Sequence, residues 1–153
     1  MNNSELKEFI LKASRATYAS GDSSMRIKQP DGSTTINYSS GDYVYHDNYF
    51  GGEPYGGREV VFYKNNPIWM MVYYGFVLPG MNNGEVYGFL TKALSNSTVE
   101  MPYRGPEKYE EGEWIYENNF SGDVEKFSGT EKICKSGMCI YEASYIGGAV
   151  DKK

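Results

Sequence analysis

The sequence has few of the residues that most often bind transition metals. It contains one histidine and two cysteines among 153 residues. Structural zinc sites use several Cys and His ligands, commonly in paired Cys-x-x-Cys spacing, and that spacing does not occur in this chain. We therefore expect no zinc site, and nothing in the sequence indicates another metal or a cofactor.

Positive charge is also scarce. The chain carries 15 Lys+Arg against 20 Asp+Glu, which gives a net charge of −5. Proteins bind nucleic acids largely through Lys and Arg side chains that displace counterions from the phosphates. An acidic chain is a poor nucleic-acid binder, so we expect no direct binding to DNA or RNA.

Long hydrophobic runs are missing as well. The longest apolar run, Ile68–Leu78, is too short to cross a bilayer, and the N-terminal residues lack the pattern of a signal peptide. We expect a cytoplasmic protein without membrane attachment. In that compartment Cys134 and Cys139 are expected to be reduced thiols, although a turn at Ser136-Gly137 would place them opposite each other and allow a disulfide.

Apolar and aromatic residues are plentiful. Hydrophobic residues make up 40% of the chain, and aromatic residues, including 15 tyrosines, make up 16%. This composition supplies enough apolar surface for a core and is too hydrophobic for intrinsic disorder. We expect one soluble domain that spans residues 1–153.

An internal repeat organises the chain. Residues 41–51 (GDYVYHDNYFG) align with residues 112–122 (GEWIYENNFSG), with four identical positions. After one extra residue the match continues at an offset of 72, where Gly57, Glu59, Ile68, Tyr73 and Gly75 meet Gly129, Glu131, Ile140, Tyr145 and Gly147. Self-similarity of this kind predicts two tandem repeats, residues 4–78 and 83–150.

Hydrophobic spacing predicts the elements of each repeat. A helix is expected around Leu6, Phe9, Ile10 and Ala13, and another around Val86, Phe89, Leu90 and Ala93. We expect Ser4 to cap the first helix and Asn82 or Asn83 to cap the second. Alternation predicts strands over residues 43–49, 58–63, 67–74, 113–120, 131–135 and 139–146.

Polar segments connect these elements. Residues 21–40 are predicted to form a loop around at most one short strand, at residues 34–38, and the acidic segment 107–113 is predicted to be a solvated connection. The expected fold class is α+β, with two tandem helix-plus-antiparallel-sheet units related by a pseudo-twofold axis.

The predicted strands suggest where a ligand would bind. Alternation places Asp47 on one face with the tyrosines of its strand, and Glu59 alternates in phase with Val61. A carboxylate on an apolar face loses hydration, which raises its pKa unless hydrogen-bond donors compensate. We predict an aromatic pocket for a small cationic or planar ligand, lined by Tyr45, Asp47, Tyr49, Glu59, Trp69 and Tyr73.

A structural interpretation of the same residues stays open. Glu59 and Glu131 would then be carboxylates bonded to backbone N–H groups, and the tyrosines would be core residues. His46 falls on the opposite strand face and is expected to be solvated. Residues 51–57 are interpreted as a turn rather than a phosphate loop, because no helix signal follows. No catalytic residue is assigned, since no nucleophile–base pair is recognisable.

Four strings of the chain also carry a family resemblance: GDYVYHDNYFGG at 41–52, EVVFYK at 59–64, YYG at 73–75 and PYRGP at 102–106. Together they resemble the bacterial domain-of-unknown-function family 5680 (DUF5680), and the resemblance runs from about Leu6 to Val150. Some members look like helix-turn-helix regulators of the XRE type that carry this domain after the DNA-binding part. The resemblance implies no agreed activity and no catalytic residue.

These observations lead to one main functional hypothesis and two alternatives. The main hypothesis is a non-enzymatic bacterial module that binds a small ligand or a protein partner, as a sensor or accessory domain associated with transcriptional regulation. One alternative is an enzyme in which Asp47 or Glu59 is the general base and tyrosines are the acids. The other is an interaction protein whose acidic second half binds a basic partner. Either a monomer or a homodimer is compatible with the sequence.

Overall fold

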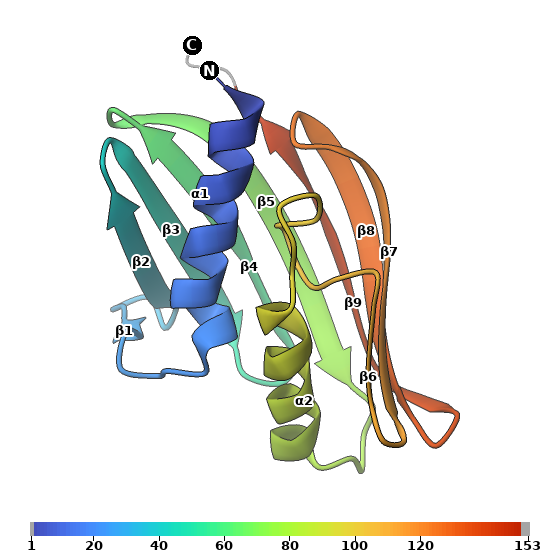
Figure 1. Ribbon diagram of the computed structural model, residues 1–153. Coiled ribbons are helices and arrows are strands. Elements are labelled where there is room, and N and C mark those ends of the chain that lie inside the picture. The colour runs from blue at the N-terminus through green and yellow to red at the C-terminus, as the bar shows by residue number, and fades with distance from the viewer. Residues whose placement is uncertain (1, 151–153) are drawn as a thin grey trace.

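The computed structural model describes residues 2–150, which form a mixed α+β fold made mostly of antiparallel sheet (Figure 1). The helices are α1 (Asn3–Ala16), the short 3₁₀ helix η1 (Tyr18–Ser20) and α2 (Asn83–Ser95). The strands are β1 (Ile27–Lys28), β2 (Thr34–Ser40), β3 (Tyr43–Gly51), β4 (Tyr55–Tyr63), β5 (Asn66–Val77), β6 (Lys108–Glu111), β7 (Trp114–Asp123), β8 (Lys126–Lys135) and β9 (Met138–Ala149).

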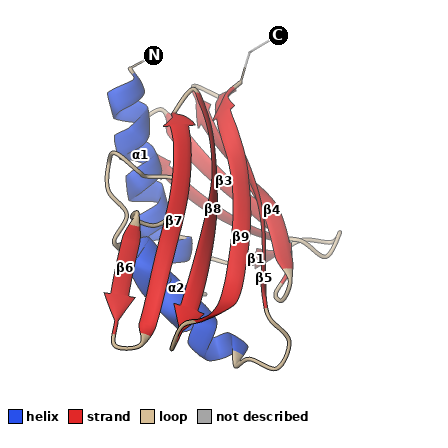
Figure 2. Cartoon of the chain, turned by 90° about the vertical axis from the view of Figure 1, so that its right-hand side faces the viewer, coloured by secondary structure: helices blue, strands red, loops and turns tan. Residues whose placement is uncertain are grey.

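The strands form one sheet in the order β1-β2-β3-β4-β5-β9-β8-β7-β6. Each half of the chain therefore builds a run of neighbouring antiparallel strands, and the two runs join where β5 pairs with β9, with Tyr73 opposite Tyr145. Both α-helices lie on the same face of the sheet (Figure 2). This one-sided cover explains why burial alternates along much of strands such as β5 and β9, because the helices cover only one face of the sheet.

Both predicted α-helices are present, and their apolar stripes face the sheet. Asn2 caps α1 by accepting a hydrogen bond from the backbone N–H of Ser4 at 3.0 Å, so the predicted Ser4 cap is wrong. Ser4 already lies within the first helical turn, and the preceding asparagine offers an equally good acceptor. Asn82 caps α2, as one of the two predicted options, and accepts from the N–H of Glu85 at 3.2 Å.

The cap of α2 gives a first prediction. Asn82→Ala removes the acceptor for the Glu85 amide and is expected to lower the free energy of unfolding by about 1 kcal/mol. Asn83→Ala is the matched control, because Asn83 is exposed inside the first turn and alanine is a good helix former. Urea denaturation of both variants tests the assignment, and an equal loss in both would contradict it.

All six predicted strands are present, and the short strand expected at residues 34–38 is present as β2, which continues to Ser40. The structure adds β1 in the segment predicted as a loop, and Thr34, Thr35 and Ile36 of β2 are buried. Their β-branched side chains fit a strand despite the polar surroundings. The segment predicted as a solvated connection contains β6, a short edge strand of exposed and half-exposed residues. Its charges are typical of a protected sheet edge.

The cysteines are joined, in contrast to the expected thiols. Ser136 and Gly137 both have positive φ and form a tight turn between β8 and β9. This turn places Cys134 directly opposite Cys139, and a disulfide connects them. The expectation of reduced thiols, drawn from the predicted compartment, is wrong because the hairpin geometry brings the two side chains together.

The core consists of two apolar clusters on the helix side of the sheet. The first includes Leu6 and Ile10 of α1 with Trp69, and the second includes Leu90 of α2 with Ile133. Aromatic rings dominate the first cluster, where Trp69 and Phe127 stack with centroids 5.6 Å apart. Tyr18 and Tyr55 pack against both clusters, so they mark the boundary between them. None of the helices in residues 2–150 has the length and apolar character that a bilayer span requires.

Candidate functional site

A cavity of about 430 Å³ lies where the two core clusters meet. Residues of η1 and α2 line it from the helix layer, and residues of β2 to β5 line it from the sheet. Its walls are rich in tyrosine: Tyr18, Tyr49, Tyr55, Tyr73 and Tyr87. Its charged lining residues are Arg26, Lys28, Asp47, Glu59 and Arg104.

Two carboxylates share the sheet wall of the cavity. Asp47 on β3 lies directly opposite Glu59 on β4, and the two residues are only 3% and 1% exposed. The hydroxyl of Tyr73 donates a hydrogen bond to Asp47 at 2.5 Å. Among residues 2–150, no side chain donates a well-formed hydrogen bond to either carboxylate oxygen of Glu59, although the nearby Tyr45 hydroxyl interacts with this group and lowers its pKa. A buried carboxyl group with so few donors is costly.

Burial shifts the titration of both carboxyl groups. Burial raises the pKa of Asp47 to about 6, although the Tyr73 hydrogen bond and the charge of Arg104 oppose the rise. Burial, together with the negative charge of Asp47, raises the pKa of Glu59 well above its usual value, and Arg104 opposes this rise. Both shifts favour the protonated forms of these carboxyl groups.

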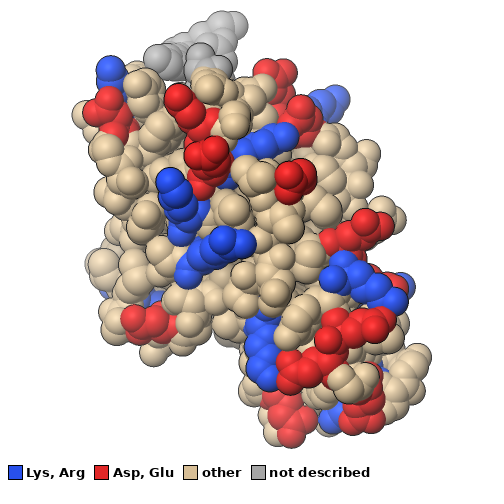
Figure 3. All heavy atoms as spheres, in the orientation of Figure 1, with Lys and Arg blue, Asp and Glu red and all other residues tan. Residues whose placement is uncertain are grey.

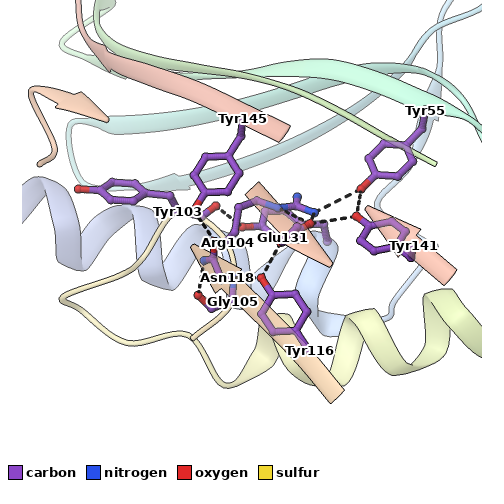
Figure 4. A network of polar contacts seen from close by, with 10 residues as sticks. Tyr55, Tyr103, Arg104, Gly105, Tyr116, Asn118, Glu131, Tyr141 and Tyr145 are labelled. Atoms are coloured by element: carbon purple, nitrogen blue, oxygen red, sulfur yellow. Dashed lines mark hydrogen bonds and ion pairs between the residues drawn. The ribbon is translucent and has the colours of Figure 1, made fainter. Parts of the chain in front are cut away.

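The second half of the sheet contains a similar carboxylate that is fully paired. Glu131 on β8 lies opposite Asn118 on β7 and is 1% exposed. Its Oε1 accepts from Nε and Nη2 of Arg104 at 3.1 and 2.5 Å and from the Tyr141 hydroxyl at 2.9 Å. Its Oε2 accepts from the Tyr116 hydroxyl at 2.5 Å. Figure 4 shows these side chains converging on Glu131.

Arg104 links the paired carboxylate to the cavity. Its guanidinium is almost fully buried, donates to the Tyr55 hydroxyl at 3.3 Å, and lies 5.7 Å from the ring centroids of Tyr18 and Tyr73. Within the described part of the chain, its hydrogen bonds go to Glu131 and Tyr55, and none reaches Asp47 or Glu59. Arg104 thus forms a cationic wall of the cavity while its charge is neutralised by Glu131.

The cavity brings together four of the six predicted site residues. Asp47, Tyr49, Glu59 and Tyr73 line it, whereas Tyr45 and Trp69 are fully buried and lie outside the lining. The Tyr45 hydroxyl and the Trp69 indole nitrogen have no hydrogen-bond partner among residues 2–150. The sequence did not identify the other polar lining residues, which are Tyr18, Arg26, Lys28, Tyr55, Tyr87 and Arg104.

The three basic residues among them were missed because they come from segments in which no strand or helix was predicted. Arg26 and Lys28 lie in the region predicted as a loop, and Arg104 lies in the irregular link between α2 and β6. One sequence signal did mark Arg104, since it stands at the centre of the PYRGP string at 102–106.

Other sequence features have structural roles. The glycine-rich segment after β3 is a turn that leads into β4, as predicted. Gly51 there has φ +80°, and a Cβ would meet the Pro54 carbonyl oxygen at 2.2 Å, so only glycine fits. His46 is half-buried beside Arg58, and burial and that positive charge lower its pKa. No group of three or more His, Cys, Asp or Glu side chains within residues 2–150 is arranged to hold a metal ion.

Comparison with known proteins identifies the family. The profile described as "Domain of unknown function (DUF5680)" matches residues 47–150. The chain belongs to the DUF5680 family. The match to DUF5680 begins at residue 47, later than the resemblance from Leu6 that the sequence suggested, and it includes Asp47, Glu59, Arg104 and Glu131. No curated protein and no solved structure matches the chain.

Proposed function

We propose that this DUF5680 chain is a small-molecule-binding domain that acts as a sensor or accessory module rather than as an enzyme. The observation that carries the proposal is the cavity with Glu59 in its wall, buried and without hydrogen-bond partners among the described residues. Its volume of about 430 Å³ is within the range of small-ligand sites. Its lining also has their usual composition, with aromatic walls and a few convergent polar groups.

The surface charges give less support to an acidic interaction surface. Acidic and basic side chains alternate near the lower ends of α2 and of the β6–β7 hairpin (Figure 3). Lys92 pairs with Glu111 at 2.7 Å, and Lys135 lies 3.7 Å from Glu85 and 3.8 Å from Glu113. The acidic side chains there are partly neutralised by lysines, so the cavity is the better candidate site.

We also infer that the two halves arose by duplication and are related by a pseudo-twofold axis. Asp47 pairs with Glu59 as Asn118 pairs with Glu131, which supports this inference. Tyr73 and Tyr145, which are equivalent in the aligned sequences, face each other across the central strand pair. In this account the carboxylate of the first half, Glu59, is left without a cation partner, whereas Glu131 of the second half is paired with Arg104.

Ligand binding can be tested without knowing the ligand. A ligand that binds only the folded state raises the melting temperature, and the rise grows with the ligand concentration relative to its Kd. We expect at least one compound in a broad library of neutral, anionic and cationic metabolites to give a concentration-dependent rise. A library that produces no such rise contradicts the proposal.

The site of binding is tested by a pair of matched tryptophan substitutions. Gly52 lines the cavity, and a Cβ there would meet open space, so Gly52→Trp places an indole at the cavity. Gly88→Trp is the control, because Gly88 is exposed on α2, outside the lining, and has equally open surroundings. We expect the first variant to weaken binding by about tenfold or more and the second to retain it. Binding that survives Gly52→Trp would place the ligand elsewhere.

A further inference from the structure

We propose that the cavity binds a small organic cation, whose guanidinium or ammonium group lies against Glu59 as the Arg104 guanidinium lies against Glu131. This inference rests on the proposed function, because it names the ligand class of the same cavity. The paired site at Glu131 provides an internal example of how this sheet binds a cation.

The two carboxylates occupy matching positions in the strand registers. Glu59 lies opposite Asp47 between β3 and β4, and Glu131 lies opposite Asn118 between β7 and β8. Two residues after each glutamate, the strand carries an aliphatic residue that pairs with an aromatic residue on each neighbouring strand. These flanking pairs are Tyr45 and Trp69 around Val61, and Tyr116 and Tyr141 around Ile133.

The two sites differ in their hydrogen-bond donors, and Asp47 and Trp69 stand where the second half has Asn118 and Tyr141. At Glu131 the Arg104 guanidinium donates from two nitrogens, and the tyrosine hydroxyls supply the remaining donors. At Glu59 no described residue donates a well-formed hydrogen bond, and the nearby Tyr45 hydroxyl carries the one polar hydrogen that acts on the carboxyl group. Glu59 is one of the residues that line the cavity, although its carboxyl oxygens are buried in this structure. Buried carboxylates are stable only when paired, and a ligand cation would supply the missing partner.

The other carboxylate and the aromatic walls favour the same ligand class. Asp47 adds a second acceptor beside Glu59, and its one hydrogen bond to a described residue comes from Tyr73. Tyrosine rings attract organic cations through their negative faces, and five tyrosines line the cavity. Arg104 already shows this contact, since its guanidinium lies over the rings of Tyr18 and Tyr73.

Binding of a cation is expected to displace the proton held by the carboxyl pair. The ligand's positive charge favours the ionised form of Glu59, so a proton leaves as the cation enters and the affinity rises with pH. Several other groups act on the same carboxyl. Those that influence Glu59 or Asp47 are Tyr45, Tyr73, Arg104 and Glu131 from the surrounding strands and link, Tyr18 from η1 and Arg26 from the segment before β1, and Lys28 of β1 is a further cation that lines the cavity. The cations among them reduce the affinity for a positive ligand, and Glu131 offsets Arg104.

Matched probes that differ in charge test this inference. Benzamidine and benzylamine are the cations, benzamide and benzyl alcohol are their neutral counterparts, and benzoate is the anion. Isothermal titration calorimetry at pH 8 is expected to show both cations binding at least about tenfold more tightly than the neutral compounds. Benzamidine affinity is expected to fall from pH 8 to pH 5.5. Neutral probes that bind as tightly as the cations, or cations that do not bind, overturn the inference.

Variants identify the carboxylate responsible. Glu59→Gln is expected to weaken benzamidine binding by about tenfold or more. Glu142→Gln is the matched control, because Glu142 is exposed on β9 and outside the cavity lining, and it should leave the affinity unchanged. If Glu59→Gln does not fold, Asp47→Asn takes its place, since Asn118 occupies the matching position in the second half. Unchanged benzamidine affinity in the folded variant overturns the inference.

The outcomes separate this inference from the proposed function. Suppose that all metabolite hits are neutral or anionic and that their binding is lost in Gly52→Trp. This result would support a binding cavity and overturn the inference that its ligand is a cation. The absence of any hit, together with no benzamidine binding, would overturn both.

Discussion

Glu131→Gln is expected to lower the free energy of unfolding by about 3 kcal/mol, because it leaves the buried guanidinium of Arg104 without its anion. The carboxylate also accepts from Tyr116 and Tyr141, and a neutral amide accepts these hydrogen bonds less strongly. The Arg104–Glu131 pair therefore holds the link between α2 and β6 against the sheet. Urea denaturation at pH 7.5 measures the loss.

The same substitution at Glu59 provides the control. Glu59 matches Glu131 in burial and register, but no residue among 2–150 donates a well-formed hydrogen bond to its oxygens and no cation pairs with it. Glu59→Gln is therefore expected to leave the free energy of unfolding unchanged or to raise it. A loss similar to that of Glu131→Gln would mean that Glu59 is a structural carboxylate, and it would remove the basis for a ligand site.

The second large effect is a fall in stability as the pH rises. The pKa of Asp47 is raised to about 6 in the folded protein, and that of Glu59 is raised further above its usual value. Groups with raised folded pKa values stabilise the protein below their unfolded pKa, and this contribution is lost as the pH rises through the folded pKa. The free energy of unfolding is therefore expected to fall between pH 5 and pH 8.

Asp47→Asn is expected to flatten this pH dependence. A rise in pKa from 3.8 to about 6 corresponds to about 3 kcal/mol, so the variant should be more stable than the wild type by about 2–3 kcal/mol at pH 8. The new amide oxygen can accept from Tyr73, as the Asn118 amide oxygen accepts from Tyr145 at 2.7 Å. Denaturation curves from pH 5 to pH 8 measure the difference.

His46 acts in the opposite direction over part of this range. Its pKa is lowered, chiefly by burial, so its contribution to stability grows as the pH rises through its titration. Comparison of Asp47→Asn with the wild type at each pH isolates the Asp47 contribution, because His46 is present in both. A wild-type protein whose stability rises with pH in parallel with the variant would contradict the buried carboxylate pair.

The strand faces could be predicted from the sequence because alternation reports burial directly. The position of Asp47 on the tyrosine face and the phase of Glu59 followed from spacing within single strands, and both residues are buried on the predicted face. The six predicted strands and two α-helices were found for the same reason, since each has a periodic apolar pattern.

The rest of the site depends on contacts between residues far apart in the sequence, which hydrophobic periodicity cannot predict. Arg104 and Glu131 are 27 residues apart, and Arg104 and Tyr55 are 49 residues apart. Arg26 reaches the cavity from an irregular segment before β1. Such side chains are positioned by tertiary packing alone, so the alignment of the repeats showed the similar carboxylates but not which of them was already paired.

A crystal structure of the protein with benzamidine tests the central claim most directly, which is that Glu59 is a cation site that the chain itself does not fill. We predict the amidinium group within hydrogen-bonding distance of Glu59 and Asp47, with its ring among the cavity tyrosines and with Arg104 still bound to Glu131. Benzamidine bound outside this cavity, an empty cavity at saturating benzamidine, or Arg104 moved from Glu131 onto Glu59 would contradict the claim.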